Sequence, residues 1–457
     1  MCGDRFQAPV TAFFRLFSRL LQFLNEIKNV LLIKSRPYSL FHSIPQTSTP
    51  MSLNFTYLPR TIETVIYRAS QRYKGVMVTG MRQVGKSTML RRMQGDRRYV
   101  NLDRYQALDL ARQAPDAFFK QYPMPLLVDE FQRAPDLGLE IKAILDETDE
   151  RGLVWLTGSQ KLGLRKAVAE ALSGRVASFE LFPFSLYELQ GKGPEQKPFM
   201  PTGELTRGSL DPLTAEELWK IIWQGSWPEV VHDEPDQRDA FFDSLLRTYI
   251  EKDILATGVR RVEDFERFLS VLASRIGQEF AIGEIQKAVG VAAETARDWL
   301  NIAVATGVVY LLPPFYENVG KTLIKKSKLY FTDTGLAAWL CQSPSPSALK
   351  NAYNAGAFFE NFVVMEIVKS WKHNGKKPLF YFYRDTRQNE IDLLIREGDI
   401  YYPIEIKSTA SPQRKMLDNF GVLKGDTIKR GPGALICTCD EPRYLTSDVV
   451  ALPVWAL

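Results

Sequence analysis

One stretch of this sequence, residues 75–88, limits what the chain can fold into more than any other. Residues 80–87 read GMRQVGKS, which fits the spacing G-x-x-x-x-G-K-S/T. The short apolar run before them is typical of a strand, and residues 88–93 after them are good helix formers. A strand, a glycine loop and a helix in this order predict a nucleotide-binding P-loop. The alternative is a glycine-bounded turn before an ordinary helix.

The chemistry of the predicted loop follows from its backbone. The two glycines allow the chain to curl until successive N–H groups face phosphate oxygens, and the positive end of the new helix adds to this attraction. Lys86 is expected to reach the β- and γ-phosphates as a catalytic residue, while the Ser87 hydroxyl ligates Mg²⁺. We therefore predict ATP and Mg²⁺ as cofactors. The predicted nucleotide-binding residues of the loop are Gly80, Met81, Arg82, Gln83, Val84, Gly85, Lys86, Ser87 and Thr88.

Two carboxylates close a later apolar strand, residues 125–130, which reads PLLVDE. Adjacent acids at the end of a buried strand need a reason, because buried charges are costly. In a P-loop protein Asp129 would organise the Mg²⁺ shell, and Glu130 would polarise the attacking water as the general base. The alternative is an ordinary strand end followed by an acid at the start of a helix. The two acids extend the prediction from nucleotide binding to ATP hydrolysis.

A further strand, residues 153–157, is followed by the sequence GSQ. We predict that Ser159 senses the γ-phosphate, with a plain turn as the alternative. Strands and helices alternate through residues 54–190, which predicts an α/β fold with a parallel sheet and helices on both faces. The nucleotide is then expected outside the carboxyl ends of the strands, where all three motifs fall.

Composition sets the scale and the surroundings of the protein. With 457 residues and 45% hydrophobic content the chain can form two or three domains with their own cores. A net charge of +5 permits binding to nucleic acid but does not demonstrate it. The four scattered cysteines argue against a disulfide framework and favour a reducing compartment, here the cytoplasm.

Residues 1–53 are expected to be an N-terminal extension outside the core. Residues 13–33 are rich in Phe and Leu, but charges such as Arg15 and Arg19 interrupt them. No apolar run approaches the ~20 residues that a membrane span needs, and the charges do not suit the core of a signal peptide. Two interpretations stay open: a loose appendage on a Pro/Ser/Thr-rich linker, or a basic amphipathic helix that lies on a membrane or a partner.

Residues 191–262 are predicted to be a linker followed by a helical lid, because a Pro/Gly-rich stretch precedes a largely helical one. Residues 263–335 show helix, tight turn, helix and strand in the order of a winged helix-turn-helix. The lysines that follow would make a basic wing suited to DNA phosphates. They are Lys321, Lys325, Lys326 and Lys328. The second helix, however, carries Glu294 and Asp298 beside Arg297, so packing against other domains is equally open.

Residues 345–457 form the predicted C-terminal domain. A strong helix over residues 355–371 carries Glu360 on an otherwise apolar face, where a carboxylate needs a partner, often a cation. Two alternating strands, 389–395 and 402–407, are separated by a turn and predict a hairpin. A hairpin of this length brings Asp392 beside Glu405, with Lys407 on the same face as Glu405. A packed helix can bring Glu360 close to them.

Four segments carry a family resemblance: DEFQRAP (129–135), SGRVASFELFPFSLYELQ (173–190), QGSWPEV (224–230) and TYIEKDI (248–254). Residues 54–457 resemble prokaryotic AAA-type P-loop ATPases in which a C-terminal domain similar to restriction endonucleases follows the ATPase. The resemblance implies an AAA-type ATPase core at residues 54–190. In related ATPases an arginine after the sensor strand contacts the γ-phosphate, in cis or from a neighbouring subunit, which implies a catalytic role for Arg175. A structural salt bridge is an equal alternative for Arg175.

The C-terminal segment is similar to the PD-(D/E)xK nuclease pattern, carried onto Asp392, Glu405 and Lys407 with Glu360 as the helix acid. Ile391 stands where the pattern has a proline. The resemblance implies a second Mg²⁺ or Mn²⁺ held by Glu360, Asp392 and Glu405, with Lys407 as a catalytic residue that orients the bound water. The alternative is a retained fold whose acids serve an ion-paired core.

Together these features predict a Mg²⁺-dependent ATPase whose hydrolysis is coupled to a DNA-facing winged helix and a restriction-endonuclease-like, α/β C-terminal domain. The alternative is an ATP-gated binding switch, with an inactive nuclease-like domain that docks DNA or a protein. ATP and DNA are the predicted partners, a protein partner and a homo-oligomer are further hypotheses, and no transmembrane span is expected.

Overall fold

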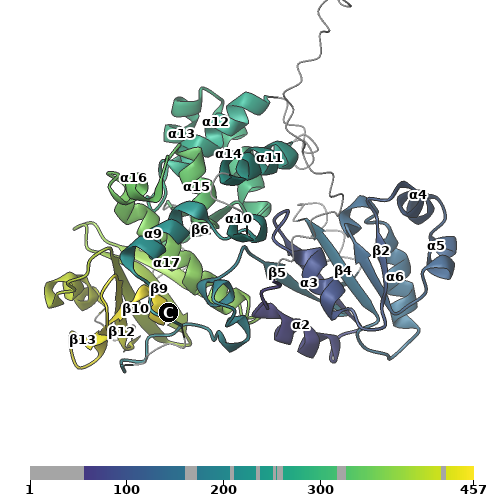
Figure 1. Ribbon diagram of the computed structural model, residues 1–457, viewed down its shortest axis with the longest axis horizontal. Coiled ribbons are helices and arrows are strands. Elements are labelled where there is room, and N and C mark those ends of the chain that lie inside the picture. Colours follow the sequence, from purple (N-terminus) through teal and green to yellow (C-terminus); the bar gives the residue numbers. More distant parts are fainter. Residues whose placement is uncertain are drawn as a thin grey trace, which may run out of the picture. The chain divides into compact units, whose positions relative to one another are not determined.

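The structure, a computed structural model, describes residues 56–159, 172–205, 210–232, 237–250, 254, 261–315, 326–423 and 429–457 (Figure 1). The predictions for residues 1–53, for Lys321 and Lys325, and for residues 251–253 lie outside these ranges. Within the described ranges no helix is both long and apolar enough to cross a membrane.

The first sheet consists of β1 (Gly75–Gly80), β2 (Arg98–Asn101), β3 (Leu126–Asp129), β4 (Val154–Ser159) and β5 (Val176–Leu181). Its strand order is β2-β3-β4-β1-β5, and every neighbouring pair is parallel. The helices around it are α2 (Ile62–Ser70), α3 (Lys86–Met93), α4 (Tyr105–Gln113), α5 (Pro115–Gln121) and α6 (Leu137–Asp146), with the short η1 (Phe131–Arg133) after β3.

Helices cover both faces of this sheet because successive strand residues point to opposite sides. Val76 and Val78 join a buried cluster with α2 and α3, whereas Met77 between them joins another cluster with α4, α5 and α6. The prediction of a parallel sheet with helices on both faces is therefore confirmed.

Helices dominate the middle of the chain. They are α8 (Leu186–Leu189), η2 (Gly193–Glu195), α9 (Ala215–Gln224), α10 (Pro228–His232), α11 (Arg238–Tyr249), α12 (Val262–Ala273), α13 (Ile282–Val289), α14 (Ala293–Ala305), α15 (Thr334–Leu340) and α16 (Pro346–Lys350). Helices α13 and α14 meet at a tight turn in which Gly290 adopts a left-handed φ of 82°. Strands β6 (Val309–Leu312) and β7 (Lys328–Phe331) then pair antiparallel. The elements follow the predicted order, while a DNA-binding winged helix stays a prediction.

The C-terminal part places one long helix, α17 (Ala355–Lys372), against a second sheet. The strands are β8 (Phe380–Arg384), β9 (Glu390–Glu397), β10 (Ile400–Lys407), β11 (Lys429–Arg430), β12 (Gly433–Cys437), β13 (Arg443–Tyr444) and β14 (Val449–Pro453), with η7 (Arg414–Val422) and η8 (Val454–Ala456) outside the sheet. The order is β13-β14-β12-β10-β9-β8, with β11 beside β10.

The predicted hairpin of the C-terminal sheet is confirmed, and its turn is tighter than expected. Glu397 pairs with Ile400 and Arg396 with Tyr401, so the ladder continues to a two-residue connection. Gly398 takes a left-handed φ of 60° there, which a glycine adopts without steric cost. The turn thus fixes the register that sets Asp392 near Glu405.

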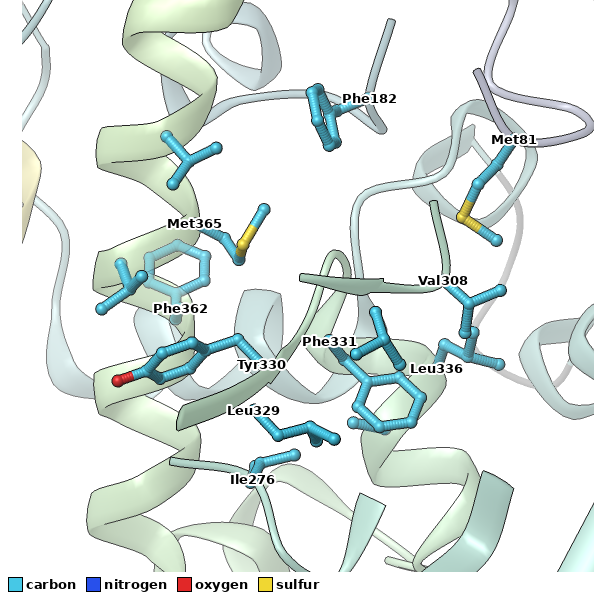
Figure 2. Close-up of a cluster of buried hydrophobic side chains, with 14 of the residues drawn as sticks. Met81, Phe182, Ile276, Val308, Leu329, Tyr330, Phe331, Leu336, Phe362 and Met365 are labelled. Atoms are coloured by element: carbon cyan, nitrogen blue, oxygen red, sulfur yellow. The ribbon is translucent and has the colours of Figure 1, made fainter. Parts of the chain in front are cut away.

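A single buried cluster connects the P-loop region to the C-terminal helix. Figure 2 shows part of it: Met81 of the P-loop, Phe331 of β7, and Phe362 and Met365 of α17. Burying one such side chain contributes about 1.5–3 kcal/mol, so a cluster of this size holds the parts together firmly. The domain boundaries drawn from the sequence stay predictions, and this cluster crosses them.

Candidate functional site

The P-loop joins the carboxyl end of β1 to the start of α3. Its backbone is left-handed at Gly80, Gln83 and Gly85, with φ values of 153°, 59° and 92°. Glycine is required at the first position, since a Cβ on Gly80 would lie 2.2 Å from the carbonyl oxygen of Leu181. A left-handed glutamine is uncommon, and its strain is confined to the tip of the loop. The loop therefore curls as the sequence pattern predicts.

Lys86 lies across this curl. Its side chain is buried, with 6% of the residue exposed, and Nζ donates to the carbonyl oxygens of Gly80 at 3.0 Å and Met81 at 2.6 Å. These bonds fix the ammonium over the loop. The cation therefore lies against the carbonyl oxygens of the loop that carries the predicted phosphate site.

Asp129 is held by a ring of hydroxyl groups. Its Oδ1 accepts hydrogen bonds from Ser87 Oγ at 2.8 Å and Thr157 Oγ1 at 2.7 Å, and its Oδ2 accepts one from the Tyr99 hydroxyl at 2.8 Å. Only 2% of Asp129 is exposed. Burial, followed by the bond to Asp129, raises the pKa of Tyr99 to about 12, so this hydroxyl stays a donor at neutral pH.

The pair formed by Ser87 and Asp129 fits a magnesium ion. A hydroxyl and a carboxylate meet there at hydrogen-bond distance, and oxygen atoms of this kind are the ligands that Mg²⁺ takes in proteins. Thr157 and Tyr99 were not predicted from the sequence. The signal for Thr157 is a polar residue in the apolar strand 153–157, but only the sheet order reveals that β2 and β4 flank β3.

Glu130 follows Asp129 in a conformation that few side chains adopt. Its φ of 57° and ψ of 39° are left-handed, and strained residues of this kind concentrate at functional sites. The turn directs the chain away from β3 directly after Asp129. The Glu130 carboxylate accepts a hydrogen bond from Gln132 Nε2. Gln132, two residues further on, is therefore the group that positions the predicted general base.

Ser159 lies beside the first glycine of the P-loop, since it pairs with Gly80 across β4 and β1. Its Oγ is buried and has no hydrogen-bond partner among the residues that the structure describes. A buried hydroxyl next to the loop agrees with the predicted sensor position, which stays a prediction.

Arg175 lies at the wrong edge of the sheet for a contact with a phosphate on its own P-loop. Strands β1 and β5 run parallel, with Gly75 opposite Val176 and Gly80 opposite Leu181. Arg175 therefore precedes β5 at the amino edge, whereas the P-loop leaves the carboxyl edge. Its Nη2 donates to Asp146 Oδ2 at 2.9 Å. The predicted contact in cis is wrong, the salt-bridge alternative holds, and a contact to a neighbouring copy stays a prediction.

Residues outside the sheet hold the carbonyl groups of the P-loop. Arg60 Nη1 donates to the carbonyl oxygen of Val84 at 2.9 Å, and the indole N–H of Trp227 donates to that of Arg82 at 3.1 Å. Trp227 belongs to QGSWPEV, one of the segments that carry the family resemblance. That segment therefore contacts the nucleotide loop directly.

A buried ion cluster continues from Arg60 to the C-terminal helix. Glu188 Oε1 lies 3.1 Å from Arg60 Nε and 3.3 Å from Nδ1 of His373, the residue that caps α17. Burial alone would raise the pKa of Glu188, but Arg60 and His373 outweigh it and hold the pKa well below its usual range. The Phe182 N–H donates to His373 Nε2 at 3.3 Å.

The segment that follows β5 also docks on α17. The Leu186 N–H donates to Glu366 Oε2 at 2.7 Å, and Lys369 Nζ donates to the carbonyl oxygen of Phe184 at 2.8 Å. Glu366 and Lys369 form a buried pair at 3.0 Å. The segment 173–190 therefore links the first sheet to α17.

The C-terminal sheet brings Asp392, Glu405 and Lys407 together as the sequence predicts. Lys407 Nζ lies 3.3 Å from Asp392 Oδ2 and 2.7 Å from Glu405 Oε1, and the Ile406 N–H donates to Asp392 Oδ2 at 2.8 Å. The other oxygen of Glu405, Oε2, is buried without a hydrogen-bond partner in the described part of the chain. Burial, with the charge of Asp392 adding to it, raises the pKa of Glu405 to about 8.

Glu360 also lies near this group, but Lys328 separates it from Asp392. The Nζ of Lys328 lies 2.9 Å from Glu360 Oε1, 2.5 Å from Glu390 Oε1 and 3.7 Å from Asp392 Oδ1. The Tyr330 hydroxyl donates to the same Glu360 oxygen at 2.6 Å. A carboxylate on the apolar face of a helix needs a partner, and Glu360 has one in the ammonium group of Lys328.

The predicted basic wing is wrong at Lys328. Only 2% of this residue is exposed, because β7 directs it toward the carboxylates of the C-terminal part. Lys326 has a half-exposed side chain and lies 4.0 Å from Glu284. Across the described ranges, no group of three or more His, Cys, Asp or Glu side chains is arranged to hold a metal ion. A metal site at Glu360, Asp392 and Glu405 is therefore not shown and stays a prediction.

Comparison with protein families divides the chain into three matched segments. Residues 72–190 match a family described as an AAA domain. Residues 215–347 and 355–457 match two domains of unknown function, DUF8612 and DUF4143. The parallel sheet and the P-loop geometry agree with the AAA match over residues 72–190. The likeness of the C-terminal part to restriction endonucleases stays a prediction.

Two curated relatives are uncharacterized proteins, Mb2031c of Mycobacterium bovis and Rv2008c of Mycobacterium tuberculosis. Each is 29% identical over 347 residues, which cover 76% of this chain and 73% of the relative. Among solved structures, the Walker-type ATPase PABY2304 of Pyrococcus abyssi is 13% identical with a TM-score of 0.40, over 63% of this chain and 99% of that one. The signal transduction ATPase PH0952 of Pyrococcus horikoshii is 13% identical with a TM-score of 0.25, over 69% and 47%. Both scores are low, so the fold assignment rests on the features above.

Proposed function

We propose that this protein binds ATP with Mg²⁺ at the P-loop and hydrolyses it. We further propose that closure of the loop on the nucleotide changes the position of the C-terminal part. The observation that carries the proposal is the ring of hydroxyl groups around Asp129, with the strained Glu130 next to it. Neutral donors fix the Asp129 carboxylate without neutralising its charge. A carboxylate fixed in this way beside Ser87 suits a metal-bound nucleotide.

Each residue of the site has a distinct task in this proposal. Mg²⁺, when bound, supplies positive charge to the phosphate oxygens. Lys86 adds a second positive charge from across the loop, and Ser87 and Asp129 hold the metal side. Glu130 accepts a proton from the attacking water, and Gln132 orients its carboxylate. Ser159, which pairs with Gly80 across the sheet, acts as the sensor.

ATP turnover by a Glu130→Gln variant tests the assignment of the base. The amide keeps the shape of the side chain but does not accept the proton, so turnover is expected to fall by about 10²–10⁴-fold while ATP still binds. Glu147→Gln, on the exposed end of α6, is the matched control and should turn over ATP like the natural protein. Equal rates for Glu130→Gln and the natural protein would remove Glu130 from the mechanism.

The contacts between the loop and the rest of the chain support an ATP-gated switch. Arg60 and Trp227 bond to carbonyl groups of the loop, and Arg60 continues through Glu188 to His373 of the C-terminal part. A loop that closes on phosphate would therefore alter the position of α17. Slower amide hydrogen exchange at residues 355–372 with ATP than without it is expected, and identical exchange in both states would contradict the switch.

We propose that the middle and C-terminal parts bind DNA. The helix-turn-helix order of α13 and α14 supports it, and so does the net charge of +5. DNA cleavage is the second candidate function, because Asp392, Glu405 and Lys407 lie together as the nuclease-like pattern predicts. It would need a second Mg²⁺ or Mn²⁺ near these two acids.

One assay separates binding from cutting. Labelled duplex DNA is incubated with the natural protein and with Asp392→Ala, in Mg²⁺ or Mn²⁺, without nucleotide and with ATP. ATP-dependent binding without cleavage favours the switch, and cleavage that Asp392→Ala abolishes favours the nuclease. Neither binding nor cleavage in any state would remove DNA and leave a protein partner as the output. For assembly, we propose a homo-oligomer in which Arg175 contacts the nucleotide bound to a neighbouring copy.

A further inference from the structure

The carboxylate cluster of the C-terminal part is built from two segments of the chain. Four acids, Glu360, Glu390, Asp392 and Glu405, come from α17, β9 and β10, within the segment that matches DUF4143. One of its two ammonium groups, that of Lys407, comes from β10 itself. The other belongs to Lys328 on β7, within the segment that matches DUF8612.

Lys328 is placed among these acids as a metal ion would be. Its Nζ lies within 3.7 Å of oxygen atoms from Glu360, Glu390 and Asp392, and it is almost fully buried. Burial would lower the pKa of Lys328, but its neighbours outweigh it and hold the pKa well above its usual range, so the group is charged. A buried ammonium is tolerated only with such partners.

One carboxylate oxygen of the cluster has no partner within the described residues. The Oε2 atom of Glu405 is buried and has no hydrogen-bond partner among the described residues, and 4% of Glu405 is exposed. Besides the two ammonium groups, the Arg384 guanidinium lies 3.6 Å from Glu390 Oε2. Carboxylate oxygens in this number are the ligands that Mg²⁺ and Mn²⁺ prefer. An ammonium already among them repels a divalent ion, because both carry positive charge.

We propose that Lys328 is a built-in cation that excludes divalent metal from this cluster. The ammonium stands between Glu360 and Asp392, so a metal ion binds there only when β7 withdraws Lys328. The hairpin of β6 and β7 thereby holds the C-terminal cluster in a metal-free arrangement. This inference is independent of ATP hydrolysis, and DNA cleavage at Asp392 would require Lys328 to leave first.

Binding of Mn²⁺ to the nucleotide-free, full-length protein tests the inference. Lys328→Met removes the charge and keeps a side chain of similar length, whereas Lys328→Arg keeps the charge. Titration calorimetry, or the loss of the free Mn²⁺ electron paramagnetic resonance signal, reports binding. We expect Lys328→Met to gain a site with a Kd below about 1 mM. Neither the natural protein nor Lys328→Arg should show this site.

A double variant assigns the gained site to the cluster. Lys328→Met combined with Asp392→Asn should lose the Mn²⁺ site again, because one of its carboxylates is gone. A rise in the melting temperature of Lys328→Met with Mn²⁺, absent in the double variant, would be the matching stability readout. A folded Lys328→Met that gains no site would overturn the inference.

The natural protein provides a test that does not depend on the folding of any Lys328 variant. If the nucleotide-free natural protein binds Mn²⁺ at a site that Asp392→Asn removes, Lys328 does not exclude metal and the inference fails. If Asp392→Asn leaves Mn²⁺ binding of the natural protein unchanged, the inference is supported. Both results leave the proposed ATP hydrolysis untouched, since they are measured without nucleotide.

Discussion

The two acidic sites of this protein differ in what surrounds their carboxylates. Three hydroxyl groups bond to Asp129 at the nucleotide site, and the nearby Lys86 is bonded instead to carbonyl groups of the loop. In the C-terminal cluster two lysines lie on the carboxylates directly. Hydroxyl donors hold a carboxylate and leave its charge available, whereas an ammonium holds it and neutralises the charge. The first arrangement suits a metal-bound ligand and the second suits a closed ion network.

The largest effect is expected from neutralising the hydroxyl-bound carboxylate. Asp129→Asn keeps the size of the side chain and removes its charge, so ATP turnover should fall by about 10³-fold, or about 4 kcal/mol of activation free energy. Steady-state phosphate release at saturating Mg²⁺ and ATP measures it. Asp116→Asn, at the exposed start of α5, is the control and should retain the natural rate. A rate for Asp129→Asn within threefold of the natural one would show that the hydroxyl ring does not mark a metal site.

A carboxylate held by a buried guanidinium should instead matter for stability. Glu188 lies beside the buried Arg60, so Glu188→Gln leaves that guanidinium without its anionic partner and should lower the free energy of unfolding by about 3 kcal/mol. The midpoint of urea unfolding at pH 7 measures the loss. Glu195→Gln, exposed in the neighbouring η2, should unfold like the natural protein.

The pH dependence of that loss has a definite sign. The pKa of Glu188 is lower in the folded protein than in the unfolded chain, so its contribution is fully present above the unfolded pKa of about 4.3. This stabilising contribution disappears as the pH falls through the pKa of Glu188 in the folded protein. The difference between Glu188→Gln and the natural protein should therefore stay constant from pH 6 to 8 and shrink in acid. A difference that grows on acidification would contradict the assigned ion cluster.

The smallest effect should come from one member of the hydroxyl ring. Tyr99→Phe removes the donor to Asp129 Oδ2 and leaves those to Oδ1 in place. A bond to a charged group contributes about 1.5 kcal/mol, so the affinity for Mg²⁺ in the presence of ATP should fall about tenfold. Mg²⁺ dependence of ATP turnover measures it. An unchanged dependence would restrict the ring to Ser87 and Thr157.

Local patterns in the sequence predicted most of the fold and the nucleotide site. The spacing of Gly80 to Ser87 specifies a loop, and the apolar run before Asp129 specifies a strand end. Each prediction therefore depends only on residues that are adjacent in the sequence. The hairpin that joins Asp392 to Glu405 was predictable for the same reason. Thr157 and Tyr99 were not, because their contact with Asp129 depends on the strand order β2-β3-β4, which no local pattern contains.

Two predictions were wrong, those for Arg175 and Lys328. The first depended on the direction of a strand, and the second on contacts between segments that are distant in the sequence. Arg175 directly precedes a strand that runs parallel to β1, and a residue at the amino end of a parallel strand lies far from the P-loop. The predicted sheet already implied this position. Lys328 is a different case, because a lysine in a basic stretch favours solvent unless carboxylates lie opposite it. Those carboxylates are more than thirty positions further along the chain.

The continuous buried cluster of Figure 2 has a consequence for dividing this protein into pieces. A fragment that ends near residue 190 would leave Met81 and Phe182 without the partners that β7 and α17 provide. Such a fragment presents a wide apolar face to water and is prone to aggregate. The described part of residues 56–457 should therefore unfold in one cooperative transition, and ATP turnover should be measured only on the whole chain.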